Sequence, residues 1–196
     1  MSLVVEPLTG EALVAALPDL ARLRITVFRD WPYLYDGTLD YERSYMEKFA
    51  SSAGAVIVAA RDGKRIVGAA TGSPMSGHAD EFARPFQQRG HDIANLFYCG
   101  ESVLSQDYRG RGIGHAFFEH REAHARRLDG FTHATFCGVV RPHDHPLRPK
   151  DYVPLDGFWR KRGYAKVDGL VGSFDWLDIG DTKKTGKPMQ FWMKAL

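Results

Sequence analysis

The stretch YRGRGIGH (residues 108–115) places three glycines and two arginines between an apolar run and a segment of helical periodicity. The apolar run, residues 96–104, predicts a strand, and residues 113–128 predict a helix that ends at the Asp-Gly pair 129–130. A strand, a glycine turn and a helix together form an anion site, because the first amides of a helix have no internal partner and carry the positive end of its dipole. We therefore expect this turn to bind an oxyanion.

The spacing of the glycines narrows the choice of ligand. The phosphate-binding pattern GxxxxGK[ST] is absent, and Gly110, Gly112 and Gly114 form GxGxG instead of the GxGxxG of dinucleotide sites. A nucleotide-dependent oxidoreductase is further disfavoured because the chain has no early βαβ pattern. The pattern that fits is R-x-x-G-x-G, which begins at Arg109.

With its surroundings, this segment resembles the GCN5-related N-acetyltransferase (GNAT) family, in which it grips the pyrophosphate of acetyl-coenzyme A (acetyl-CoA). A β-hairpin predicted from residues 55–60 and 65–72, with Asp-Gly at its tip, precedes it, and an apolar strand at 133–140 follows the helix. Further on, FWRKRGY (158–164) is similar to the family signature FYxKxGF. The resemblance covers residues 50–196 in order and spacing, and the N-terminal third in element order alone.

The resemblance implies an α/β fold with a mixed, mostly antiparallel central sheet. Helices would flank this sheet, and its strands would splay near Glu101 and Leu104 to admit the cofactor. We expect a single acetyltransferase domain over residues 1–196, with a polar insertion at 76–91. Periodicity predicts three N-terminal elements: a strand at 2–5, helical turns at 11–29 broken near Pro18, and a helix at 41–50.

Carried over by position, the resemblance implies that backbone amides of the turn bind the pyrophosphate. The residues concerned are Arg109, Gly110, Arg111, Gly112, Ile113, Gly114 and His115. Val103 and Leu104 would offer strand-edge hydrogen bonds to the pantetheine arm and the acetyl carbonyl. The Arg111 guanidinium is either a phosphate ligand or a solvated side chain. The implied acyl donor is acetyl-CoA, and no metal is expected.

Glu101 is the candidate catalytic base. Acetyl transfer requires a deprotonated amine, and this carboxylate lies in an otherwise apolar strand, three residues before Leu104, where the thioester would enter. A buried carboxylate is costly unless function or pairing compensates for it. The alternative role of Glu101 is therefore an ion pair with an arginine from elsewhere in the chain.

The general acid is not assigned by the sequence. The resembled family uses the tyrosine of FYxKxGF, but the matching residue is Trp159, whose indole N–H does not protonate a thiolate at neutral pH. Tyr152, Tyr164 and His143 are the replacements considered. The expected function is N-acetyltransfer, with a primary amine attacking directly in a ternary complex. Because of Trp159, a non-catalytic acyl-CoA binding or sensing domain is the alternative.

Two loops are expected to line the acceptor site. The connector DWPYLYDG (30–37) carries Tyr33 and Tyr35, which either line a pocket or form an apolar plug. The loop RPHDHPLRPK (141–150) carries His143 and would favour an acceptor with a carboxylate or phosphate, although solvation of the loop explains the same charges. The expected partner is a small-molecule or peptide amine.

Composition and motif spacing argue against several other functions. With 26 basic and 24 acidic residues, the net charge of +2 gives no general field for nucleic acid or a membrane surface. The N-terminus resembles neither a signal peptide nor a membrane span, so a cytoplasmic protein is expected; a homodimer is left open. Cys99 and Cys137 are expected to be buried reduced thiols, and His120 and His124, spaced HREAH, to be structural rather than metal ligands.

Overall fold

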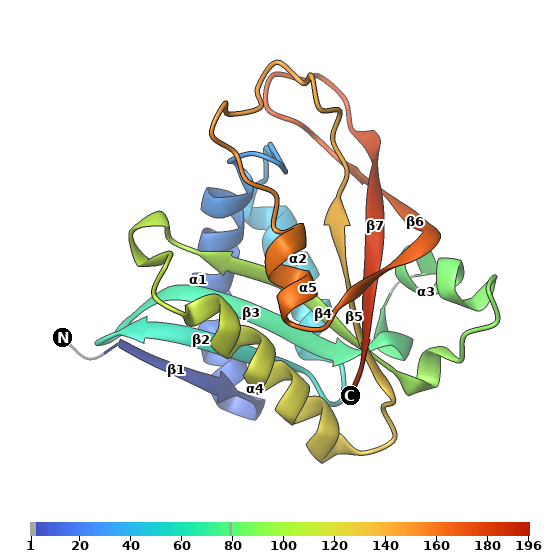
Figure 1. Cartoon of the computed structure of the whole chain (residues 1–196). Coiled ribbons are helices and arrows are strands. Elements are labelled where there is room, and N and C mark those ends of the chain that lie inside the picture. The colour runs from blue at the N-terminus through green and yellow to red at the C-terminus, as the bar shows by residue number, and fades with distance from the viewer. Residues whose placement is uncertain (1–2, 79) are drawn as a thin grey trace.

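The computed structural model describes residues 3–78 and 80–196 and contains one seven-stranded sheet (Figure 1). Its strands are β1 (Leu3–Leu8), β2 (Val56–Asp62), β3 (Arg65–Pro74), β4 (Leu96–Leu104), β5 (His133–Val139), β6 (Ala165–Trp176) and β7 (Thr185–Ala195). They are ordered β1-β2-β3-β4-β5-β7-β6, and every neighbouring pair is antiparallel except β4 and β5. The prediction of a mixed, mostly antiparallel sheet is confirmed.

Helices cover both faces of the sheet (Figure 1). They are α1 (Gly10–Phe28), α2 (Leu39–Ala50), α3 (Asp80–Gln87), α4 (Ile113–Leu128) and α5 (Asp156–Lys161), with single 3-10 turns at Met75–Gly77, Ile93–Asn95 and Gln106–Tyr108. Strand β2 shows why two layers form: Val56 and Val58 pack in the α4 core, whereas Ile57 and Ala59 pack with α1 and α2. In the part of the chain that the structure describes, no helix is long and apolar enough to cross a bilayer.

Helix α1 and the segment 76–91 differ from or add to the sequence-based predictions. Helix α1 continues through Pro18, so the predicted break is wrong. Pro18 and Val14, whose carbonyl loses its helical donor, are both exposed, and water can satisfy that carbonyl. The polar segment 76–91 contains α3, whose Phe86 is fully buried against the β6–β7 end of the sheet. An apolar face thus fixes this segment to the fold.

The sheet opens between β4 and β5. The two strands pair only at Leu96–His133, Phe97–Ala134 and Tyr98–Thr135, which confirms the predicted splay. Next to this opening, β4 also bulges against β3, because Gly100 and Glu101 together face the single residue Thr71. A Cβ atom at Gly100 would lie 2.5 Å from Thr71 Oγ1, so the bulge requires glycine there.

Candidate active site

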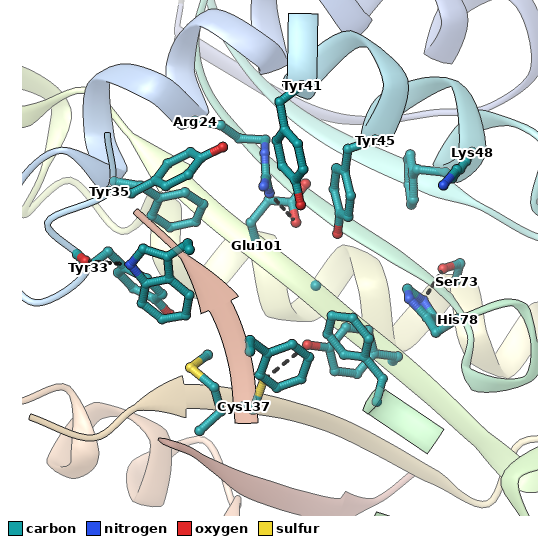
Figure 2. Close-up of a pocket in the computed structure, with 18 of the residues that line it drawn as sticks. Arg24, Tyr33, Tyr35, Tyr41, Tyr45, Lys48, Ser73, His78, Glu101 and Cys137 are labelled. Carbon is teal, nitrogen blue, oxygen red and sulfur yellow. Dashed lines mark hydrogen bonds and ion pairs between the residues drawn. The ribbon is translucent and has the colours of Figure 1, made fainter. Parts of the chain in front are cut away.

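A pocket of about 360 Å³ lies on the α1–α2 side of the splay (Figure 2). Ten of its 21 lining residues are phenylalanine, tyrosine or tryptophan: Phe28, Tyr33, Tyr35, Tyr41, Tyr45, Phe49, Phe82, Tyr98, Phe174 and Trp176. They come from α1, the connector after it, α2, α3, β4 and β6. The volume suits a small molecule, and Glu101 from the β4 bulge is part of the lining.

Glu101 is held by a buried arginine. Arg24 Nη1 lies 2.8 Å from Glu101 Oε2, and Arg24 Nε donates to Glu42 Oε2 at 2.5 Å. The side chains are 11%, 5% and 0% exposed for Arg24, Glu101 and Glu42. Burial opposes ionisation of Arg24, but the two carboxylates outweigh it and raise the arginine pKa. The ion pair considered as the alternative role of Glu101 is therefore present.

In the triad formed by Arg24, Glu42 and Glu101, one carboxylate oxygen has no hydrogen-bond partner among the described residues. Tyr35 donates its hydroxyl to Glu42 Oε1 at 2.9 Å, so both oxygens of Glu42 are bonded. Glu101 Oε1 is buried and has no hydrogen-bond partner. Two carboxylates and one guanidinium give the triad a formal charge of −1. The pocket wall thus presents an unsatisfied acceptor and an excess negative charge.

His78 lies on another side of the pocket (Figure 2). Its Nε2 is 2.8 Å from Ser73 Oγ, and its ring packs edge-on against Tyr98 at 4.7 Å. Burial lowers the pKa of His78 to about 4, so the ring is neutral at pH 7. Burial likewise raises the pKa values of Tyr33 and Tyr45, which are therefore neutral hydroxyls.

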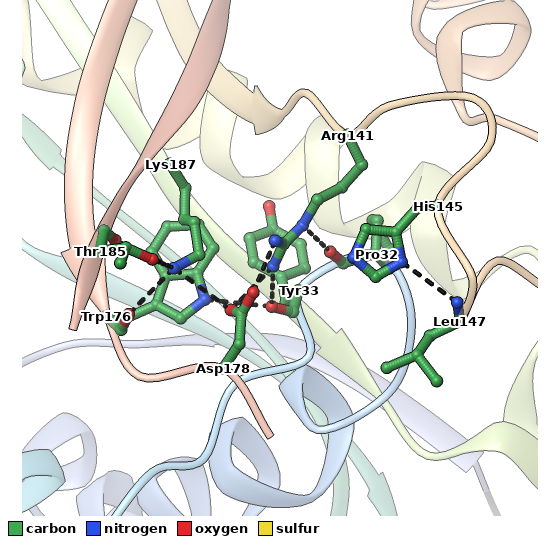
Figure 3. Close-up of polar contacts among 9 residues, drawn as sticks. All are labelled: Pro32, Tyr33, Arg141, His145, Leu147, Trp176, Asp178, Thr185 and Lys187. Carbon is green, nitrogen blue, oxygen red and sulfur yellow. Dashed lines mark hydrogen bonds and ion pairs between the residues drawn. The ribbon is translucent and has the colours of Figure 1, made fainter. Parts of the chain in front are cut away.

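One wall of the pocket is held by contacts of Arg141 with Asp178 and with the connector 30–37 (Figure 3). We call these contacts the Arg141 clamp. Arg141 binds both carboxylate oxygens of Asp178, at 2.7 and 2.9 Å, and donates to the carbonyls of Pro32 and Tyr33. Burial alone would raise the pKa of Asp178, but hydrogen bonds and charge from Arg141 and from Lys187 lower it. Arg141 thus anchors the connector that carries the pocket tyrosines.

The glycine turn has the geometry that an anion site needs. Gly110 and Gly112 have φ values of +77° and +79°, which residues other than glycine rarely adopt. Gly112 is the N-cap of α4. The amides of Arg109 and His115 already donate to Gln106 O and Gly112 O, at 3.1 and 3.0 Å. Among the described residues, no backbone acceptor receives the amides 110–112. Ile113 and Gly114 open the helix, where amides lack internal partners.

Other predicted cofactor residues lie beside this turn. Val103 is buried and pairs with Ala69, and Leu104 pairs with Gly68 at the end of β4. The side chain of Arg109 reaches back to Leu104 O at 3.4 Å. Arg111 is exposed and donates to Asp107 O at 2.8 Å, so it has a local partner in this structure.

Trp159 packs against the sheet. Its ring lies 5.0 Å from Phe136 and 5.1 Å from Trp192, and its edge would be 2.9 Å from a Cβ atom at Gly138. Tyr164 donates to Glu122 on the α4 side at 3.2 Å and does not line the pocket. These contacts explain why an indole fits at the position of the family tyrosine.

Of the three predicted substrate residues, the structure brings two into the pocket. Tyr33 and Tyr35 line it, whereas His143 is exposed in its loop and outside the lining. The HREAH histidines are partly or wholly buried as expected, with His124 Nε2 3.0 Å from Gly54 O. Cys99 is a buried free thiol.

Cys137 differs from its prediction, because it is only half-buried and lines the pocket. A cysteine in an apolar strand looks like a core residue in sequence, but the strand splay exposes one side of β5. Burial still raises the pKa of its thiol to about 12, and its Sγ lies 3.1 Å from the Tyr98 hydroxyl. The group is a neutral thiol at pH 7.

Most residues that hold or line the site were missed in the sequence, and three of them bear directly on Glu101 or on the charge of the pocket. Arg24 and His78 line the pocket, and Arg121 of α4, 1% exposed, donates to Thr71 O and Glu101 O across the bulge at 3.1 and 3.3 Å. Only Arg121 carried a local signal, since it lies next to the apolar stripe of a predicted helix. The other two depend on contacts between distant segments.

Solved structures of similar fold span nearly the whole chain. A ribosomal-protein-alanine N-acetyltransferase from Brucella melitensis is 15% identical, with a TM-score of 0.61 and coverage of 98% of this chain and 99% of that one. An acetyltransferase from Thermus thermophilus is 15% identical, with a TM-score of 0.58 and coverage of 100% and 98%. A GCN5-related N-acetyltransferase from Kribbella flavida is 16% identical, with a TM-score of 0.57 and coverage of 99% and 98%. At these identities the likeness shows the fold.

Sequence comparison gives the family. Comparison with curated proteins finds no significant relative. The family model described as acetyltransferase (GNAT) family matches residues 20–149, about two thirds of the chain. This match includes the second half of α1, the bulged β4, the glycine turn and α4. The chain therefore belongs to the GNAT acetyltransferase family.

Proposed function

We propose that this chain transfers an acetyl group from acetyl-CoA to a primary amine, by direct attack in a ternary complex. The observation that carries the proposal is the unpartnered Glu101 Oε1 at the β4 bulge. Glu101 lines the pocket, and the same strand leads to the glycine turn. An amine in the pocket and a thioester in the splay would meet at this point, with a proton acceptor beside them.

The proposed step is one addition and one elimination. The amine nitrogen forms a bond to the thioester carbonyl carbon, the C–S bond breaks, and the amine proton goes to Glu101 Oε1 directly or through one water. The coenzyme leaves as a thiolate, which takes a proton from solvent to give the free thiol, and Glu101 returns its proton to solvent. Amides of residues 110–114 would hold the pyrophosphate, and the Val103–Leu104 edge would orient the pantetheine arm.

Trp159 supports a second candidate function. Its packing against Phe136 and Trp192 leaves no phenol at the position of the family tyrosine. A domain that binds acyl-CoA without turning it over would need no acid there. The free carboxylate oxygen of Glu101 favours the enzyme. A domain that only binds acyl-CoA does not require an unpaired buried acceptor in a residue that lines the pocket.

The decisive experiment is continuous detection of free thiol with acetyl-CoA and a panel of primary amines. The enzyme predicts amine-dependent thiol release, with initial-rate lines that intersect when both substrates are varied. Parallel lines would contradict direct attack and indicate an acyl-enzyme. Thermal stabilisation by acetyl-CoA with no thiol release on any amine would favour the binding or sensing function.

A further inference from the structure

We propose that the pocket selects an arylalkylamine, a small primary amine on a short chain with an aromatic body, which binds as an ammonium on Glu101 Oε1. The inference rests on the proposed function, since it takes the pocket as the acceptor site. It goes further, because it names the class of amine and the residues that recognise each end of it.

The charge of the pocket selects the ammonium end. Arg24 is shared by Glu42 and Glu101, so the buried triad has a formal charge of −1 and one oxygen with no donor. A buried acceptor without a partner is unfavourable, and a ligand N–H would satisfy it. An ammonium supplies both the donor and the missing positive charge, whereas an alcohol supplies the donor alone.

The walls select the aromatic end. Phe82, which lines the pocket, packs on Phe174 with ring centroids 4.3 Å apart and on Tyr98 at 5.1 Å. Edge and face contacts of this kind would continue onto a ligand ring. The neutral phenol rings near Glu101 also present negative faces to an ammonium.

The remaining charged groups disfavour amino acids and diamines. Among the described lining residues, the groups able to carry positive charge are Arg24, Lys48 and His78. Arg24 is occupied by two carboxylates, His78 is neutral, and Lys48 is exposed. A ligand carboxylate would thus enter with no buried cation to meet it. A second ammonium would find only exposed Asp175 besides Glu101.

The test is calorimetric binding to the full chain in the presence of coenzyme A, which prevents turnover. The ligands are 2-phenylethylamine, 2-phenylethanol, phenylalanine and 1,4-diaminobutane. We expect 2-phenylethylamine to bind at least tenfold more tightly than 2-phenylethanol, the usual gain from one charge-assisted hydrogen bond. It should also bind more tightly than phenylalanine, which brings an unpaired carboxylate, and than 1,4-diaminobutane, which brings a second ammonium and has no ring. Equal affinities, or tighter binding of the diamine or the amino acid, would overturn the inference even if those amines support thiol release.

Two variants and one control variant test the two ends of the ligand separately. In Glu101→Gln the preference for 2-phenylethylamine over 2-phenylethanol should disappear, whereas Glu42→Gln, with the same change in formal charge, should reduce it only in part, because the free oxygen of Glu101 remains. In Phe174→Ala the affinity for 2-phenylethylamine should fall at least threefold. An unchanged amine preference in Glu101→Gln would overturn the assignment. Selective binding of 2-phenylethylamine without thiol release from acetyl-CoA would support the inference and contradict the proposed acetyl transfer.

Discussion

Glu101→Gln is the substitution that best tests the chemistry. It changes the formal charge of the Arg24–Glu42–Glu101 triad from −1 to 0 and replaces the free carboxylate oxygen by an amide that donates hydrogen bonds. The amide oxygen can still accept from Arg24, which also keeps Glu42 at 2.5 Å. We therefore expect turnover to fall by roughly 10²-fold, the usual contribution of a positioned base. The cost in stability should be about 1 kcal/mol.

Glu42→Gln is the matched control. It makes the same change in formal charge within the same triad, but both oxygens of Glu42 are already bonded, to Arg24 and to the Tyr35 hydroxyl. That hydroxyl can turn from donor to acceptor and satisfy the new amide group. Turnover per folded molecule should fall much less than in Glu101→Gln.

The assay is thiol release at saturating acetyl-CoA, normalised to the folded fraction measured by circular dichroism. Glu101→Gln should recover part of its activity at high pH, because an aliphatic amine with a pKa near that of lysine, about 10.4, then deprotonates in solution. Equal losses in the two variants would show that triad charge matters and the base does not. Wild-type turnover in Glu101→Gln at pH 7 would remove Glu101 from the mechanism.

Three further substitutions test other parts of the site. Gly112→Val forces a β-branched residue to φ +79°, a strain of about 1–2 kcal/mol, and should abolish the thermal shift caused by coenzyme A. Gly114→Ala is the control and should keep that shift. Equal shifts in Gly112→Val and wild type would refute the anion site. Trp159→Phe should retain turnover and Trp159→Tyr should raise it; a collapse in Trp159→Phe with intact cofactor binding would assign the indole a catalytic part. The pKa of His78, about 4 in the folded state against 6.5 unfolded, means that the unfolded chain protonates first as pH falls. Wild type should therefore lose about 3 kcal/mol more than His78→Gln between pH 7 and 4, measured by urea unfolding, and parallel pH profiles would contradict the burial of a neutral ring.

Local patterns predicted the parts of the fold that local forces determine. The Asp-Gly hairpin, the glycine turn and helix α4 each lie within a short stretch whose periodicity and turn residues agree, and the structure has all three. The β4 bulge also has a local mark in the sequence, since Gly100 interrupts the apolar run 96–104. Pro18 misled because the cost of a proline in a helix depends on whether water reaches the freed carbonyl.

The pocket beside Glu101 depends on contacts that no local pattern reveals. Arg24 lies in α1 and pairs with Glu101 in β4. The sequence therefore predicts that Glu101 could pair with an arginine, but it does not show which arginine. His78 follows the 3-10 turn Met75–Gly77 and contacts Ser73 of β3, Phe82 of α3 and Tyr98 of β4, three separate elements. His143 was predicted to bind the acceptor, but it is exposed and does not line the pocket. In the same loop, Arg141 is the residue that holds the connector.

The Arg141 clamp also imposes an order on assembly during synthesis. Arg141 bonds to Pro32, 109 residues earlier, and to Asp178, 37 residues later. Translation delivers the chain from its N-terminus, so β2, β3, β4, the glycine turn and α4 are available to pack while Asp178 has not yet been made. The Arg141 clamp, which holds the connector with Tyr33 and Tyr35, can therefore be completed only after the segment between β6 and β7 has been translated.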